Sequence, residues 1–257
     1  MSSPTTHQSL VSHQFSAAAA AYVASPVHAT GEDLAQIGAA LRDVKPSRVL
    51  DLGCGGGHAS FAAAPHAGEV VAYDLSADML AAVSAEAARR GLSNIVTRQG
   101  AAESLPFADA SFDAVLTRMS AHHWSDVGAG LREARRVLKP GGRAMFIDVS
   151  APDHPGFDTW FQTMELLRDP SHVRNYSHAE WMRHLAAAQF RVDGLTPRRL
   201  RLDFASWTAR LSTPPLHVQA LRALHARMPA EIAAYFELEP DGSFTIDTLT
   251  IEAHAAL

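Results

Sequence analysis

Two aspartates and three glycines stand at spacings that suit the binding of a nucleoside-like ligand. Asp51 belongs to a short apolar run, and Gly53, Gly55 and Gly57 follow it at every second position. Glycine has no Cβ, so the chain can turn sharply here and its backbone can approach a ligand closely. A helix that begins after this turn places N–H groups beside the same ligand. The pattern predicts a ligand-binding turn, and a tight strand-to-helix turn that binds nothing is the alternative.

A second acid, Asp74, ends the next apolar run. At the end of a second parallel strand, such a carboxylate accepts hydrogen bonds from both ribose hydroxyls of a bound nucleoside. Leu75 and Met79 follow and offer an apolar surface to one face of an adenine ring. Asp74 also stands where a helix N-cap is expected, and Met79 where an amphipathic helix buries core residues. Both structural roles stay open beside the binding roles.

Two adjacent histidines, His122 and His123, follow the fourth apolar run and precede Trp124. Histidine titrates near neutral pH and therefore suits a general base. We interpret His123, and secondarily His122, as candidate catalytic residues, and Trp124 as a wall of the pocket. The alternative for the two histidines is that they cap or line the helix that follows.

Short apolar runs alternate with longer helical patterns between residues 48 and 149. The expected strands are residues 48–52, 69–73, 95–97, 112–116 and 143–149. The expected helices are residues 31–44, a stretch through 64, 77–90 and 127–138. Alternation at this spacing predicts parallel strands joined by crossover helices on both faces of one α/β sheet.

The pattern changes after residue 150. Residues 157–168 and 178–188 are expected helices, residues 190–195, 200–204 and 244–252 are expected strands, and two helical stretches are expected between 207 and 236. We therefore divide the chain into three parts. Residues 1–44 form an N-terminal arm and helix, residues 45–150 the core, and residues 151–257 the substrate-side helices and the last strands of the same sheet.

Composition excludes several classes of protein. The chain has 257 residues, of which 47% are hydrophobic, and a net charge of −5 with a pI near 6.3, so it lacks the broad basic footprint of a nucleic-acid-binding protein. One cysteine, Cys54, excludes an internal disulfide and a multi-cysteine zinc site, and no His-Glu-x-x-His pattern occurs, so no metal is expected. No apolar run reaches the ~20 residues of a membrane span, and the first 31 residues lack the charged head of a secretory signal. A cytoplasmic protein is expected.

Together these motifs resemble the class I S-adenosylmethionine-dependent methyltransferases, methyltransferase type 11 domain, and in particular the small-molecule branch that includes ubiquinone and menaquinone C-methyltransferases. The resemblance covers about residues 12–200 and rests on five ordered segments: 49–58, 73–76, 100–107, 111–113 and 136–142. It implies a Rossmann-like, seven-stranded, mostly parallel sheet with helices on both faces and an antiparallel final strand. The resemblance further implies that the N-terminal arm and helix, residues 1–44, cover the cofactor, and that a helical lid or insertion lies near the C-terminus.

The resemblance also implies a cofactor and a site. S-adenosyl-L-methionine would bind, with S-adenosyl-L-homocysteine as the product. Asp51 and the backbone at Gly53 and Gly55 would hold the methionine moiety, Asp74 the ribose and Met79 the adenine. The remaining cofactor-binding candidates are Gly57, Leu75, Ala101, Ala102, Thr117, Arg118 and, in the arm, Tyr22. Many relatives carry an acid where this chain has Ala101, so contacts to the adenine edge are expected from backbone N–H groups.

The expected activity is transfer of a methyl group, by in-line displacement, to a carbon or oxygen of a small organic acceptor. Two alternatives are a non-catalytic module that binds the same cofactor and a nicotinamide-dependent oxidoreductase, although His58 stands where the dinucleotide fingerprint requires glycine or alanine. Nucleic acid is not expected as substrate, because the basic pairs 89–90, 135–136 and 198–199 are interpreted as solvated helix ends or loop positions. The sequence specifies neither the acceptor nor an oligomeric state.

Overall fold

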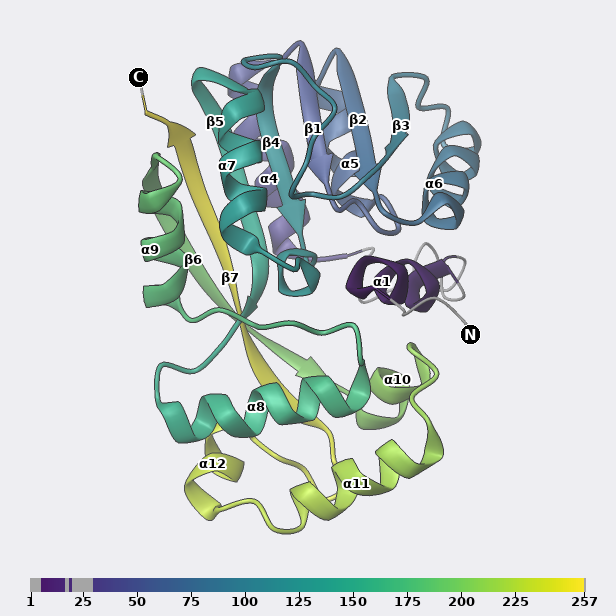
Figure 1. Cartoon of the computed structure of the whole chain (residues 1–257), viewed down its shortest axis with the longest axis vertical. Coiled ribbons are helices and arrows are strands. Elements are labelled where there is room, and N and C mark those ends of the chain that lie inside the picture. The colour runs from purple at the N-terminus through teal and green to yellow at the C-terminus, as the bar shows by residue number, and fades with distance from the viewer. Residues whose placement is uncertain (1–5, 17–18, 20–29, 257) are drawn as a thin grey trace.

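One mixed sheet forms the centre of the molecule (Figure 1). The computed structural model describes residues 6–16, 19 and 30–256. The strands are β1 (Arg48–Leu52), β2 (Glu69–Asp74), β3 (Ile95–Gln99), β4 (Phe112–Arg118), β5 (Leu138–Ser150), β6 (Phe190–Leu202) and β7 (Phe244–Ala255). Their order is β3-β2-β1-β4-β5-β7-β6, with β1 to β5 parallel and β7 antiparallel to both of its neighbours. The expected α/β fold with a reversed last strand is confirmed.

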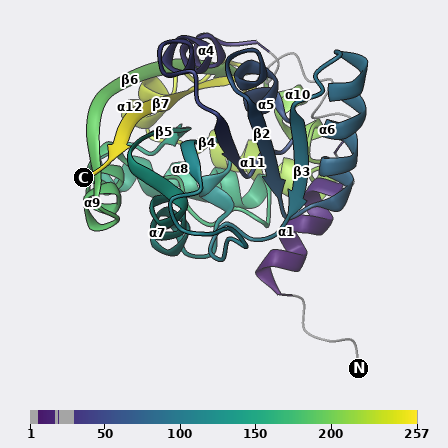
Figure 2. The ribbon, with the colours of Figure 1, turned by 90° about the horizontal axis from the view of Figure 1, so that it is seen from above.

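Helices cover both faces of this sheet (Figure 2). They are α1 (His7–Ser16), α4 (Glu32–Val44), α5 (His58–Ala63), α6 (Ala77–Arg89), α7 (Val127–Val137), α8 (Pro155–Arg168), α9 (His178–Ala187), α10 (Phe204–Ala209), α11 (Pro215–His225) and α12 (Ala230–Tyr235). Apolar residues of α4 and α5 pack on one face of the sheet, and those of α7 and α9 pack on the other. The central strands are therefore buried on both sides, which explains why they appear in the sequence as continuous apolar runs.

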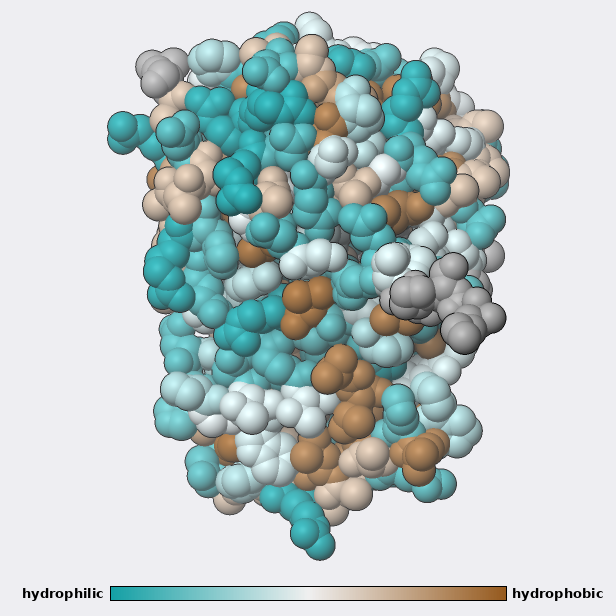
Figure 3. Space-filling model, in the orientation of Figure 1, coloured by the Kyte–Doolittle hydropathy of each residue, from teal (hydrophilic) through white to brown (hydrophobic). Residues whose placement is uncertain are grey.

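A second helical layer lies at one end of the long strands β6 and β7 (Figure 1). In it, α8 and the segment α10–α12 surround a core that includes Trp207, Phe236 and Phe244. Apolar side chains also gather on the surface of this layer (Figure 3), where Leu166 of α8 and Leu216 of α11 are exposed. None of the helices in the described part of the chain is long and apolar enough to cross a membrane.

Two expectations for residues 190–236 were wrong. The strands expected at 190–195 and 200–204 form one continuous strand, β6, with Pro197 inside it. Because β6 is the edge strand of the sheet, the N–H group that proline lacks need not join a ladder. Phe204 instead begins α10, whose N-cap Asp203 accepts a hydrogen bond from the N–H of Ser206 at 2.8 Å. The helical stretches expected between 207 and 236 are divided among α10, α11 and α12.

The first helix, α1, lies beside α6 at the carboxyl ends of the parallel strands (Figures 1 and 2). Ser16 at its end shares a hydrogen bond with Ser76 at 2.9 Å, and the ring nitrogen Nε2 of His7 contacts the carbonyl of His123 at 2.9 Å. These contacts connect the arm to two loops that follow β2 and β4. The part of the arm that contains Tyr22 lies outside the described residues.

Candidate functional site

The turn after β1 has the backbone that only glycine adopts readily. Gly53, Gly55 and Gly57 all have positive φ angles, +72°, +49° and +79°. A Cβ on Gly53 would lie 1.9 Å from the hydroxyl of Ser120, whereas a Cβ on Gly55 would have no described heavy atom within 4 Å. Gly53 is therefore required by close packing, and Gly55 leaves room at the surface of a cavity.

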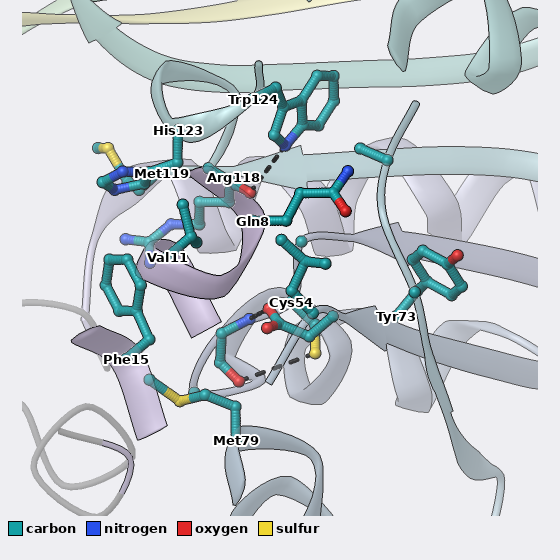
Figure 4. Close-up of a pocket in the computed structure, with 18 of the residues that line it drawn as sticks. Gln8, Val11, Phe15, Cys54, Tyr73, Met79, Arg118, Met119, His123 and Trp124 are labelled. Carbon is teal, nitrogen blue, oxygen red and sulfur yellow. Dashed lines mark hydrogen bonds between the residues drawn. The ribbon is translucent and has the colours of Figure 1, made fainter. Parts of the chain in front are cut away.

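We call this cavity the first cavity. It lies at the carboxyl ends of β1, β2 and β4, and α1 covers it. Figure 4 shows Phe15 of α1 and Met79 of α6 near one end of it, with Trp124 at the other. The lining residues that the sequence predicted are Gly53, Gly55, Asp74, Leu75, Met79, Ala102, Arg118 and His123. Ligands of open parallel sheets bind at this edge, so the position suits a cofactor.

Asp74 is held by two backbone N–H groups. Its Oδ2 accepts a hydrogen bond from Gly55 at 2.8 Å, and its Oδ1 accepts one from Ser76 at 2.9 Å. Burial raises the pKa of this carboxyl despite those bonds. Each oxygen keeps a lone pair for a further donor. Asp74 is not the N-cap of α6, because Ser76 is: its hydroxyl accepts the N–H of Met79 at 3.2 Å.

Asp51 is fully buried behind the turn and does not line the first cavity. The hydroxyl of Ser60 donates to its Oδ2 at 2.6 Å, while Oδ1 has no hydrogen-bond partner among the described residues. Burial raises the pKa of this carboxyl to about 6. A buried carboxylate oxygen without a partner is costly in the unliganded protein, so Asp51 is a candidate for interaction with a positively charged or hydrogen-bond-donating ligand group.

Replacing Asp51 with asparagine is expected to stabilise the unliganded protein by about 2–3 kcal/mol at pH 7. The folded carboxyl has a pKa near 6, above its ordinary value of 3.8. Between these values the folded state holds a proton that the unfolded chain has released, so the stability of the wild type falls as pH rises through pH 4–6. Asparagine does not titrate there. Urea unfolding at pH 4 and pH 7 measures the effect, with Asp78→Asn as an exposed control. The same stability difference at both pH values would contradict the assignment.

Several predicted residues do not line the first cavity. They are Asp51, Gly57, Ala101, Thr117 and His122. Side chains of a strand alternate between its faces, so Thr117 and Arg118 point to opposite sides, and Thr117 is buried within the sheet. Gly57 begins α5, where a Cβ would meet Val83 at 2.9 Å. The carbonyl of Ala101 accepts a hydrogen bond from Tyr73 at 3.3 Å.

Other lining residues were missed in the sequence. They are His7, Gln8, Val11, Phe15, Cys54, Gly56, His58, Ala59, Tyr73, Gly100, Glu103, Met119, Ser120 and Ser125. Trp124, which we interpreted from the sequence as a wall of the pocket, also lines this cavity. Glu103 directly follows the predicted residues 101 and 102, and this position in the sequence could have identified it as a lining residue. Its carboxylate accepts the N–H of Ser125 at 2.8 Å and so connects two loops of the cavity.

A second cavity, with a volume of about 510 Å³, adjoins the first. The two share Phe15, Arg118, Met119 and His123. The second cavity extends between β6, the end of α8 and the start of α4. Arg198 and Arg199 line it, so the interpretation of this pair as solvated loop positions was wrong. They lie in the edge strand β6, whose continuation through Pro197 was not expected.

The two histidines have different environments. His122 Nδ1 contacts Asp148 Oδ1 at 2.6 Å. Burial alone would lower the pKa of His122, but the adjacent carboxylate raises it above its ordinary value. His123 Nδ1 lies 3.1 Å from the carbonyl of Ser171, which can only accept, so Nδ1 carries the proton and Nε2 keeps a lone pair. Burial and the neighbouring His122 lower the pKa of His123 to about 3.

His123 is therefore neutral at pH 7, and it is the histidine that lines both cavities; His122 lines the second cavity alone. Within the described part of the chain, no group of three or more histidine, cysteine, aspartate or glutamate residues is placed to hold a metal ion.

Comparisons with known proteins place this arrangement among methyltransferases. A family described as "Methyltransferase domain" matches residues 50–146. The uncharacterized protein YafE of Escherichia coli K12 is 52% identical over 200 residues, which are 78% of this chain and 97% of that protein. The uncharacterized methyltransferase YcgJ of Bacillus subtilis is 39% identical over 200 residues, 78% of this chain and 79% of that protein.

The solved structure of YcgJ superposes with a TM-score of 0.84 and 33% identity, and covers 88% of this chain and 99% of that one. A more distant relative is the ubiquinone/menaquinone biosynthesis C-methyltransferase UbiE of Bradyrhizobium diazoefficiens. It is 39% identical over 121 residues, which are 46% of this chain and 48% of that protein.

Proposed function

Because the chain belongs to the class I methyltransferase family, we propose that it binds S-adenosyl-L-methionine in the first cavity and methylates a small organic acceptor in the second. The observation that carries this proposal is the pair of adjoining cavities, which share Phe15, Met119 and His123 at their boundary. Two reactants that meet at one boundary can be held in line, and such positioning supplies on the order of 7–11 kcal/mol of barrier reduction.

The residues of the first cavity fit this cofactor. Gly55 leaves space where a Cβ would stand, and the carboxylate of Asp74 beside it can accept the two ribose hydroxyls. Leu75 and Met79 supply the apolar surface for the adenine. Asp51 offers an unpaired oxygen behind the turn. When bound, the cofactor supplies an activated methyl group, so the protein has to bind, orient and exclude water.

His123 is proposed as the base for an acceptor whose carbon or oxygen loses a proton. Its Nδ1–H is held by Ser171, which orients the ring and keeps the lone pair on Nε2. Phe15 of α1 packs edge-on against this ring, with centroids 4.9 Å apart. The phenyl ring therefore restricts the imidazole and shields it from water at the boundary of the two cavities.

The three parts of the chain acquire roles under this proposal. Residues 1–44 cover the cofactor through α1, residues 45–150 supply the turn and the carboxylates, and residues 151–257 supply much of the second cavity. A volume of about 510 Å³ suits a small molecule. The net charge of −5 supports a small acceptor over a nucleic acid.

Calorimetric titration of the purified protein with S-adenosylmethionine and, separately, with NADH tests the cofactor assignment. We expect micromolar binding of S-adenosylmethionine and no heat of binding for NADH. A nicotinamide-dependent oxidoreductase predicts the reverse, so NADH binding would overturn the proposal. Methyl transfer to any acceptor would in turn exclude a module that only binds the cofactor.

A further inference from the structure

We propose that the acceptor is an anion with an apolar body, a carboxylate or a phosphate monoester, whose charged group is bound by Arg168 and Asn175 in the second cavity. This inference rests on the proposed function, because the second cavity is assigned to the acceptor through its boundary with the first. It adds a chemical class of substrate, which the family assignment leaves open.

The lining of the second cavity carries an excess of positive charge. Among the described residues it contains five arginines, Arg118, Arg168, Arg198, Arg199 and Arg210, and three acids, Glu32, Asp33 and Glu165. This excess stands out in a chain whose net charge is −5. Glu32 is largely exposed at the rim, with 87% of its side chain accessible, and Asp33 is paired with Arg118. The acids that face the cavity therefore offset the arginines only in part.

Arg168 is the most suitable of these arginines for a ligand. Its side chain is 12% exposed at the end of α8, where its Nε–H donates to the carbonyl of Trp207 at 3.0 Å and its guanidinium lies 5.1 Å from the indole centroid. Its ion pair with Glu165 is long, 3.5 Å. A guanidinium has five N–H donors in a planar fork, so further donors remain for bidentate binding of a carboxylate or phosphate.

Three of the other arginines, Arg118, Arg198 and Arg199, are more firmly engaged. Arg118 forms a close ion pair with Asp33, and Arg199 contacts Asp247 at 3.0 Å. Arg198 donates to Gln36 at 2.6 Å and to Thr250 at 2.8 Å. These contacts fix the walls of the cavity.

Asn175 is the second, independent observation. This residue is 1% exposed and lines the cavity, yet neither atom of its side-chain amide has a hydrogen-bond partner within the described ranges. Its backbone is fixed on both sides by Gln162, which accepts from the N–H of Asn175 at 3.1 Å and donates to its carbonyl at 2.8 Å. Buried amides are nearly always hydrogen-bonded, so an amide held in this way calls for a ligand group.

Apolar groups complete the cavity. Leu200 and Leu202 of β6, Ile246 of β7 and the ring of Trp207 form walls beside the arginines. Because a ligand would contact charged donors and apolar walls together, its anionic group must be attached to a hydrophobic body. Such a ligand would extend from Arg168 towards His123 at the boundary with the first cavity.

The test uses the full-length protein saturated with S-adenosylhomocysteine and measures ligand binding by calorimetry. The probes are 3-phenylpropionate with its neutral amide, and phenyl phosphate with phenol, so that the carboxylate and phosphate arms are separate. We expect the preferred anion to bind about tenfold or more tightly than its neutral partner, since a charge-assisted hydrogen-bonded contact is worth that factor. Equal affinity for anion and neutral partner, or no binding of either anion at millimolar concentration, would overturn the inference.

Two variants locate the charged group. Arg168→Gln should reduce affinity for the preferred anion about tenfold or more and leave that of the neutral partner within about twofold. Asn175→Leu should also weaken binding of the preferred anion. It should leave the melting temperature of the free protein unchanged or higher, because the amide that it removes has no described partner. Arg89→Gln, on the exposed end of α6, is the matched control.

The results separate the two proposals. If S-adenosylhomocysteine does not bind, the proposed function fails, and the acceptor assignment fails with it. If it binds and Arg168→Gln and Asn175→Leu both retain the wild-type preference for the anion, the anion site assigned here is wrong while the methyltransferase function stands. Should Arg168→Gln not fold, Asn175→Leu alone decides the question.

Discussion

Replacing His123 with glutamine is expected to lower kcat by about 10²–10⁴-fold, the usual contribution of a positioned general base. The prediction applies to an acceptor that loses a proton on methylation. Glutamine preserves the polarity of the site and cannot take up that proton. The measurement is kcat with saturating S-adenosylmethionine and acceptor, together with the dissociation constant of the cofactor, which should change little.

The pH dependence adds a second readout for His123. Burial and the nearby His122 lower its pKa to about 3, so the imidazole is already neutral between pH 5 and pH 8. The wild-type rate should therefore not fall with a midpoint near pH 6.5. In His122→Gln the neighbouring cation is absent, the pKa of His123 rises towards its ordinary value, and the acid limb of the rate profile moves to higher pH.

His66→Gln is the control for this series, because His66 lies in the turn 64–66 and lines neither cavity. A His123→Gln protein with wild-type kcat would exclude His123 as the base. In that case its contact with Phe15 would be a packing contact alone.

Replacing Asp74 with alanine is expected to weaken S-adenosylmethionine binding about 10- to 150-fold, which corresponds to about 1.5–3 kcal/mol. The variant removes the acceptors proposed for the ribose hydroxyls. It also removes the bonds that hold Gly55 and Ser76, so the turn loses part of its preorganisation. Calorimetry at a temperature where circular dichroism shows the variant to be folded gives the dissociation constant.

Two further variants make the Asp74 result specific. Asp78→Ala removes an exposed acid from the first turn of the same helix and should bind the cofactor as the wild type does. Asp74→Asn keeps one acceptor oxygen and should fall between the wild type and Asp74→Ala. An unchanged dissociation constant for Asp74→Ala would remove Asp74 from the ribose site.

Local sequence was sufficient for the central sheet and the turn after β1. The alternation of apolar runs with helical patterns identified β1, β2, β4 and β5, because strands buried on both faces are mostly apolar. The glycines at 53, 55 and 57 predicted a sharp turn, and all three have positive φ there. These features depend on chirality and on neighbouring residues, which a single sequence contains.

Roles that depend on distant partners were harder to predict. The sequence left open whether Asp74 caps a helix or binds a ligand, and the structure assigns the N-cap to Ser76. Thr117 and Arg118 are adjacent in sequence, yet only Arg118 lines a cavity, since a strand directs them to opposite faces. The side of the sheet on which a polar residue lies is decided by the register of the whole strand.

The sequence by itself determined the α/β sheet, the glycine turn and the two acids beside it, because periodicity, chirality and chain order act over short distances. Only the tertiary structure decided that residues 190–202 form one edge strand, and that Arg168, Asn175 and His123 share a second cavity. Those arrangements bring together groups that are far apart along the chain. Their positions follow from the packing of complete helices and strands, which no local pattern encodes.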